Sequence, residues 1–370
     1  MLYSVEKLVK DPLEIDFGDI EAPSKDVQEL INNLPSVNEI KKEDVFSIAD
    51  SNTLFIIGNG FDNHHSLSTK YTDFRDYLKD NDTKLLDALE NNFGLDRNKD
   101  YLWNSFEDRL KHCESIPYDQ NVSVSKKTAS TPIADLINQI YYIELNLNQK
   151  IFNWIRDKAQ EKISKEISDK ELLLQNSDSL FLSFNYTTVL EDCYGIPESQ
   201  IFHIHGKFSK NNKEQLFVGF GDTNFNVLEN YQKNTDCIES VETEGESINK
   251  MSLKGKDNAL SIFSKEDRDR LFAFFTNRNK SSYLSEFNLY NFNIRILRKL
   301  SEVNKVIILG HSLGTSDVLS LKLLRDKLGD HVHWYLGIYS KLENKYINNF
   351  SKIALFKMLL DQEHLNYFKW

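Results

Sequence analysis

The residue types most able to do chemistry stand directly after runs of apolar residues. Residues 54–57 (LFII) lead into Gly58 and Gly60, which one residue separates. Glycine lacks a Cβ, so this turn can take positive φ, bring the main chain close to a ligand and direct its N–H groups toward an anion. The segment therefore predicts a nucleotide-binding loop after a buried parallel strand. A plain turn between strand and loop stays an equal alternative, because Asn63 occupies the place of the third glycine in the dinucleotide fingerprint.

Three further polar clusters follow predicted strands. They are Asn185 to Thr188, His205 with Gly206, and Gly310 to Leu313. Ligands of open α/β sheets bind beyond the carboxyl ends of the strands, so we expect these clusters to share one site with the glycine turn. The imidazole of His205 has an ordinary pKa near neutrality and suits proton transfer. A lone histidine is more often packed or solvated, so the prediction depends on the three accompanying clusters.

These clusters must be positioned by a parallel sheet. Strand patterns fall at 179–185, 200–205, 214–219, 303–309 and 332–337, and a helical pattern runs from Thr69 to Asn176. Within it, Trp103 and Phe106 are expected in the core, which leaves Glu107 able to face the pocket. The predicted fold class is α/β, a parallel sheet with large helical insertions.

The predicted organisation has five parts. They are an N-terminal extension (1–50), a nucleotide-binding core (51–68 with 178–345), a helical insertion (69–177), a second insertion (222–290) and a C-terminal helix (346–370).

Composition narrows the function classes. The 370 residues carry a net charge of −11, which disfavours nucleic-acid binding because phosphate contacts require clustered Lys and Arg. The three cysteines are far apart and form neither a disulfide framework nor a zinc site, and no metal is expected. The adjacent His64 and His65 lack the i, i+4 spacing of helical metal ligands. No apolar run approaches the roughly 20 residues of a membrane helix, so a cytoplasmic protein without membrane contact is expected.

Several of these motifs together resemble the abortive-infection AbiH family of bacterial anti-phage proteins. The likeness is carried by IIGNGFDNHHSLSTKYTDF at 56–74, WNSFE at 103–107, FNYTTVLE at 184–191, HIHG at 203–206 and LGHSLGTSD at 309–317. The chain is also similar to the sirtuin-like NAD-binding superfamily, whose glycine loop, strand-end Asn, His-Gly pair and late glycine loop follow in the same order. That resemblance implies a sirtuin-like Rossmann core and NAD as ligand or substrate.

The resemblance also implies roles for individual residues. Asn185 would orient the ribose hydroxyls or a water, His205 would act as general base, and Asp62 would stabilise an oxocarbenium-like centre. The implied contacts to NAD come from Gly58, Asn59, Gly60, Phe61, Thr187, Gly206, Gly310, His311 and Ser312. The implied activity is hydrolysis of NAD, or of a related nucleotide, to nicotinamide and ADP-ribose during phage infection. A phage-derived activator and a homo-oligomer are further partners that the family role leaves open.

Two alternatives remain. A nucleotide-sensing or protein-binding defence module without turnover is one, because Asn59, Asp62 and Thr187 depart from the residues usual in the sirtuin-like superfamily. The other is a serine esterase, because residues 310–314 (GHSLG) match the G-x-S-x-G nucleophile elbow with Ser312 as nucleophile. The acid and histidine candidates that follow Ser312 crowd into residues 330–333, which disfavours the esterase.

Overall fold

A computed structural model describes most of the chain. The described residues are 38–110, 130–166, 178–209, 216–219, 299–311, 317–338 and 365–370, together with five positions between 266 and 274. The predicted second insertion over 222–290 lies almost entirely outside them, as do residues 1–37 of the predicted extension.

A parallel sheet of seven strands forms the centre of the described structure. The strands are β1 (Asn38–Glu39), β2 (Thr53–Ile57), β3 (Leu180–Ser183), β4 (Ile201–His203), β5 (Lys305–Leu309), β6 (His333–Ile338) and β7 (Leu365–Lys369). Their order is β1-β7-β6-β5-β2-β3-β4, and every neighbouring pair is parallel. Helices accompany the sheet, so the predicted α/β class with a parallel sheet is confirmed.

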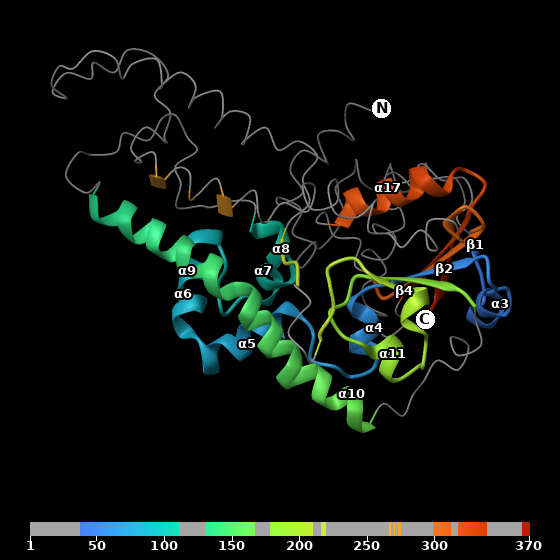
Figure 1. Ribbon diagram of the computed structural model, residues 1–370, viewed down its shortest axis with the longest axis horizontal. Coiled ribbons are helices and arrows are strands. Elements are labelled where there is room, and N and C mark those ends of the chain that lie inside the picture. The colour runs from blue at the N-terminus through green and yellow to red at the C-terminus, as the bar shows by residue number, and fades with distance from the viewer. Residues whose placement is uncertain are drawn as a thin grey trace, which may run out of the picture.

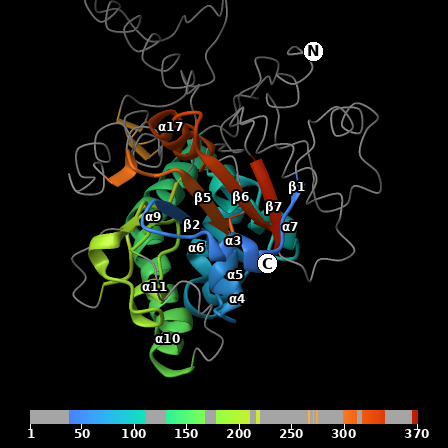
Figure 2. The same cartoon turned by 90° about the vertical axis from the view of Figure 1, so that its right-hand side faces the viewer.

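The strand β2 shows why both faces of this sheet must be covered. All five of its residues are buried, as expected for a strand between two layers. Leu54 and Ile56 point to the face covered by α17 (Val318–Leu328). Phe55 and Ile57 point to the opposite face, where α3 (Lys42–Ser47) and α11 (Val189–Asp192) pack. Figure 2 shows β5, β6 and β7 side by side, with α17 on one side of them and α3 on the other.

Two predicted elements differ from the structure. The predicted C-terminal helix over 346–370 is wrong at residues 365–369, which form β7, while residues 346–364 lie outside the described part. The aromatic residues Tyr367 and Phe368 favour a strand, and the edge of β6 offers them hydrogen-bonding partners. The predicted strand over 214–219 is not found at its described residues 216–219. Leu216 and Val218 pack into the helical core instead.

A helical layer stands beside the sheet, within the span of the predicted helical insertion. It comprises α5 (Tyr71–Asn81), α6 (Thr83–Phe93), α7 (Asp100–Asn104), α8 (Phe106–Arg109) and α9 (Ser130–Ile155), which continues through the π-helix η1 (Arg156–Gln160) into α10 (Glu161–Glu166). The Asp82 side chain caps α6 by accepting from Leu85 N at 3.0 Å, and Gly94 ends that helix with a φ of 60°. Trp103 and Phe106 are fully buried, as predicted. Figure 1 shows these helices gathered to the left of the sheet.

The direction of the sheet order reverses at β2. From β2 the chain proceeds to β3 and β4 on one side, and then returns to β5, β6 and β7 on the other. Such a reversal opens a crevice outside the carboxyl ends of the two central strands, where loops depart in opposite directions. Here those strands are β2 and β5, so the loops that follow Ile57 and Leu309 flank the crevice.

Candidate functional site

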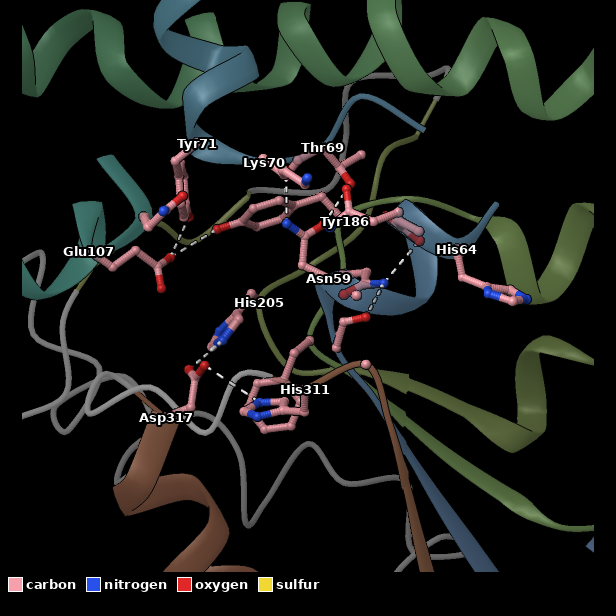
Figure 3. A pocket seen from close by; sticks show the side chains of 18 of the residues that line it. Asn59, His64, Thr69, Lys70, Tyr71, Glu107, Tyr186, His205, His311 and Asp317 are labelled. Carbon is pink, nitrogen blue, oxygen red and sulfur yellow. Dashed lines mark hydrogen bonds and ion pairs between the residues drawn. The ribbon is translucent and has the colours of Figure 1, made fainter. Parts of the chain in front are cut away.

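A cavity of about 590 Å³ lies at this crevice, between the carboxyl edge of the sheet and the helical layer. The sheet side contributes residues after β2, β3, β4 and β5, and the helical side contributes residues from α5, α7, α8 and α9. The lining includes Gly58, Asn59, Gly60, Asp62, His64, Lys70, Tyr71, Glu107, Asp108, Trp154, Asn185, Tyr186, His205, Gly310, His311, Asp317 and Trp370. Its size falls within the range of ligand pockets. Figure 3 shows the labelled side chains converging from both sides.

The glycine turn after β2 packs directly on the turn after β5. A Cβ at Gly60 would stand 2.7 Å from the Cα of Gly310, and one at Gly58 would stand 2.8 Å from the Gly310 carbonyl oxygen. Gly58 has a φ of −115°, and Gly60 does not adopt a positive φ either. The expected positive φ is therefore wrong for both glycines. They are needed because the two turns approach each other closely, while Gly310 does adopt a positive φ of 65°.

The N–H groups of this turn are used inside the protein. Gly58 N donates to Leu309 O at 2.9 Å, Gly60 N to Gly310 O at 2.6 Å, and Phe61 N to Gly58 O at 2.9 Å. The prediction that these N–H groups face an anion is therefore wrong for these three residues. Gly58, Asn59 and Gly60 nevertheless line the cavity. Asn59 Nδ2 donates to the carbonyl oxygen of Thr69 (2.7 Å), and Thr69 Oγ1 donates to Asn59 Oδ1 (2.6 Å).

The aromatic ring of Phe61 lies in the core and not in the cavity. It is fully buried and stacks on Trp370, with centroids 6.0 Å apart and an interplanar angle of 4°. His64 lines the cavity beside Trp370, whereas the ring of His65 bonds to Phe61 O and to the Tyr194 hydroxyl, each at 2.7 Å. The described residues hold no group of three or more His, Cys, Asp or Glu side chains placed to bind a metal ion.

Asp62, Asn185 and Thr187 form one buried cluster beneath the cavity. Asn185 Nδ2 donates to Asp62 Oδ1 (2.9 Å) and to Gly58 O (3.1 Å), and Thr187 Oγ1 lies 2.8 Å from Asp62 Oδ2. Burial raises the pKa of the Asp62 carboxyl to about 7, against the hydrogen bonds from Thr187 and Asn185, which lower it. Thr187 thus holds the Asp62 carboxyl group, and Asp62 holds the amide of Asn185.

The orientation of the Asn185 amide follows from its partners. Both neighbours of Nδ2 are acceptors, so the amide nitrogen must face them and Oδ1 must face the other way. Asn185 lines the cavity and is 6% exposed, and its Oδ1 has no hydrogen-bond partner in the described structure. A buried acceptor in this position favours a ligand or water that donates a hydrogen bond.

Asp317 brings two histidines together at the sheet edge. Its Oδ1 lies 3.2 Å from His205 Nε2, and its Oδ2 lies 3.6 Å from His311 Nε2. Both imidazoles also contact the ring of Phe184, with centroid distances of 5.4 Å and 4.4 Å. All three polar groups line the cavity. A carboxylate held against a histidine stabilises the imidazolium that forms when the ring takes up a proton, which is the arrangement a general base requires.

The strand that precedes His205 ends earlier than predicted, at His203. The ring of His203 bonds to the Asn185 carbonyl and to Glu191 Oε1, both at 3.0 Å. His203 and Glu191 therefore fix the backbone of Asn185 from behind the site. Neither residue is assigned a role from the sequence, although both lie within the family motifs. Gly206, with a φ of 75°, forms the turn after His205 and is not among the lining residues.

The helical layer adds a hydrogen-bonded group to the opposite wall. Glu107 Oε1 accepts from the Tyr71 hydroxyl at 2.8 Å, and the Tyr186 hydroxyl lies 3.4 Å from the same oxygen. Tyr186 also donates to Phe217 O at 3.0 Å. Burial and the neighbouring Glu107 charge raise the pKa of both tyrosines well above the usual value, so they remain hydrogen-bond donors. Glu107 thus faces the cavity, as the helical pattern of residues 103–107 allows.

The serine of the G-x-S-x-G match, Ser312, lies outside the described residues. Its proposed partners do not reach the site. His333 pairs with Lys305 at the amino end of β5, whereas Gly310 follows the carboxyl end of the same strand. At about 3.3 Å per residue, this separation is roughly 16 Å. Residues 330–333 therefore lie at the wrong edge of the sheet for a triad.

One of three comparisons with known proteins supports the resemblance to the AbiH family. None of the described helices is both long and apolar enough to cross a membrane. Searches of curated proteins and of solved structures find no match. Residues 54–337 match the sequence profile of the family described as "Bacteriophage abortive infection AbiH", over a span that contains β2 to β6 and most of the cavity lining. The chain therefore belongs to the bacteriophage abortive infection AbiH family, which implies a role in abortive infection.

Proposed function

We propose that the protein binds NAD, or a closely related nucleotide, in this cavity and hydrolyses its nicotinamide N-glycosidic bond. The observation that carries the proposal is the meeting of Asn185, His205 and the β2 turn in one cavity at the reversal of the sheet. Numbered from β2, the six strands β2 to β7 follow the order 3-2-1-4-5-6 of dinucleotide-binding sheets. This order, together with the sequence resemblance, supports a sirtuin-like Rossmann core.

The chemistry assigns different roles to the two central side chains. Asn185 Oδ1 accepts a hydrogen bond from a ribose hydroxyl or from the attacking water, because its amide nitrogen is already held by Asp62 and Gly58. His205 accepts the proton of that water, and Asp317 stabilises the resulting imidazolium. The water oxygen bonds to the ribose C1′, the bond from C1′ to the ring nitrogen breaks, and neutral nicotinamide leaves with its electron pair. The proton passes from His205 to solvent, leaving ADP-ribose.

In this proposal Asp62 is a positioning residue. Its carboxyl group bonds to Asn185 and Thr187, and it is 1% exposed. It orients the amide that contacts the ribose. This replaces the direct contact with an oxocarbenium-like centre that the resemblance implies.

A nucleotide-binding module without turnover is the second candidate. It is favoured by the burial of the proposed base, because His205 is 4% exposed and water must reach it through the cavity. Binding without product formation would be its signature.

The test compares nicotinamide release by wild type with that by three single variants, alongside thermal melting. Asn185→Ala and His205→Ala should lower the rate about 10²–10⁴-fold while the protein stays folded. His333→Ala is the matched control, since that histidine is exposed at the other edge of the sheet and should leave the rate unchanged. A folded His205→Ala variant with the wild-type rate would contradict the assignment.

A further inference from the structure

Charged side chains are distributed unevenly around the cavity. Among the described lining residues, Asp62, Glu107, Asp108 and Asp317 supply four carboxylates, and Lys70 is the one lysine. Figure 3 shows Glu107 and Asp317 near His205, His64 far from them, and Lys70 between, beside Thr69. An acidic wall alone specifies no ligand, but the buried Asn185 Oδ1 that lacks a partner requires a donor in the same cavity.

The carboxylates are not equivalent. Asp62 is bonded to Asn185 and Thr187, and Asp317 lies against two histidines. Glu107 accepts from the hydroxyl of Tyr71, a neutral donor that orients the carboxylate in the cavity wall. A negative charge fixed in a partly closed cavity attracts a cation more strongly than the same charge does in water.

Lys70 is the one lysine among the described residues that line the cavity. Lys70 precedes α5, is exposed, and makes no ion pair with any described residue. The N–H groups of Gly58, Gly60 and Phe61 in the β2 turn donate to protein carbonyls, so these three do not bind a phosphate. Lys70 is therefore the group on the described cavity wall best suited to a phosphate.

We propose that the helical layer, through Glu107 and Lys70, orients the nucleotide by its charges and selects the oxidised form. This inference rests on the proposed function. The cationic pyridinium end lies at Glu107 beside Asn185 and His205, and the pyrophosphate lies toward Lys70. Reduced dinucleotide, whose nicotinamide ring is neutral, gains nothing from Glu107, and it binds more weakly than NAD.

Calorimetric titration with three probes tests this orientation. NAD, NADH and ADP-ribose share the pyrophosphate, and only NAD carries the pyridinium charge. Titrations in the His205→Ala background keep NAD from being consumed. Glu107→Gln keeps the acceptor for Tyr71 and should weaken NAD about tenfold while leaving NADH and ADP-ribose within about twofold. Lys70→Gln should weaken all three probes by a similar factor of about ten.

Matched controls remove the same charges elsewhere. Glu302→Gln and Lys158→Gln change exposed residues that do not line the cavity and should leave all affinities unchanged. Equal binding of NAD and NADH, or equal effects of Glu107→Gln on all three probes, would overturn the inference and leave the proposed function standing. Failure of all three probes to bind would overturn both.

Discussion

Replacing Asp62 by asparagine should change how the stability of the protein depends on pH. The pKa of the Asp62 carboxyl is about 7 in the folded protein, raised by burial, and its usual value is 3.8. Between these two values the folded state holds one proton that the unfolded state has released. The unfolding free energy therefore falls as pH rises, by about 1.4 kcal/mol per unit. Because half of the proton is already lost at pH 7, the fall from pH 5 to pH 7 amounts to about 2 kcal/mol for the wild type.

The amide introduced by Asp62→Asn would remain neutral at every pH and could keep the contacts of the carboxyl group. Its oxygen can accept from Asn185, and its nitrogen can donate to the Thr187 hydroxyl. The stability of Asp62→Asn relative to wild type should therefore increase by about 2 kcal/mol between pH 5 and pH 7.

Thermal melting at half-unit steps from pH 5 to pH 8 measures this difference. Exposed Asp80 on α5 provides the control, since Asp80→Asn should melt in parallel with wild type across the range. Parallel melting curves for Asp62→Asn and wild type would refute the argument, because they would show that the buried carboxyl takes up no proton near neutrality.

Three further predictions concern the loops at the sheet edge. Gly310→Ala should destabilise the protein by more than about 1–3 kcal/mol in chemical unfolding, because its Cβ would collide with Phe61 N. Gly195→Ala, at a φ of 68° with open space around it, should destabilise the protein less. Equal losses of stability in the two variants would refute the argument from close packing. Asp317→Asn should lower kcat at least tenfold and change the pH profile of kcat, while the melting temperature stays near that of wild type. An unchanged pH profile would show that Asp317 does not act through His205. A fluorophosphonate probe should leave Ser312 unlabelled, and stoichiometric labelling of it would instead favour the esterase.

The central strands could be predicted because local pattern and tertiary environment agree. The apolar runs at 54–57 and 305–309 have no polar face, which is the pattern of a strand covered on both sides. The last two strands at the β1 end of the sheet carry no such signal. β1 has two residues, and β7 mixes buried and partly exposed positions, so its residues resemble a helix end until β6 is present to pair with them.

The site could be predicted in part for a similar reason. Strand-end polar residues share an edge in any parallel sheet, so Asn185 and His205 could be placed there without coordinates. Asp317 could not, because it follows β5 by eight residues and no local pattern indicates its contact with His205. Nor could the sequence predict that N–H groups of the β2 turn donate to protein carbonyls, because these bonds depend on the contact with the turn at Gly310.

Direct analysis of products tests the central claim. Purified full-length protein is incubated with NAD, and nicotinamide and ADP-ribose are quantified by mass spectrometry, with His205→Ala as the parallel sample. We predict that wild type forms the two products in equal amounts and that His205→Ala forms neither above background. Intact NAD after incubation with folded wild type would contradict the account. Calorimetric binding of NAD without products would then favour the nucleotide-binding module without turnover.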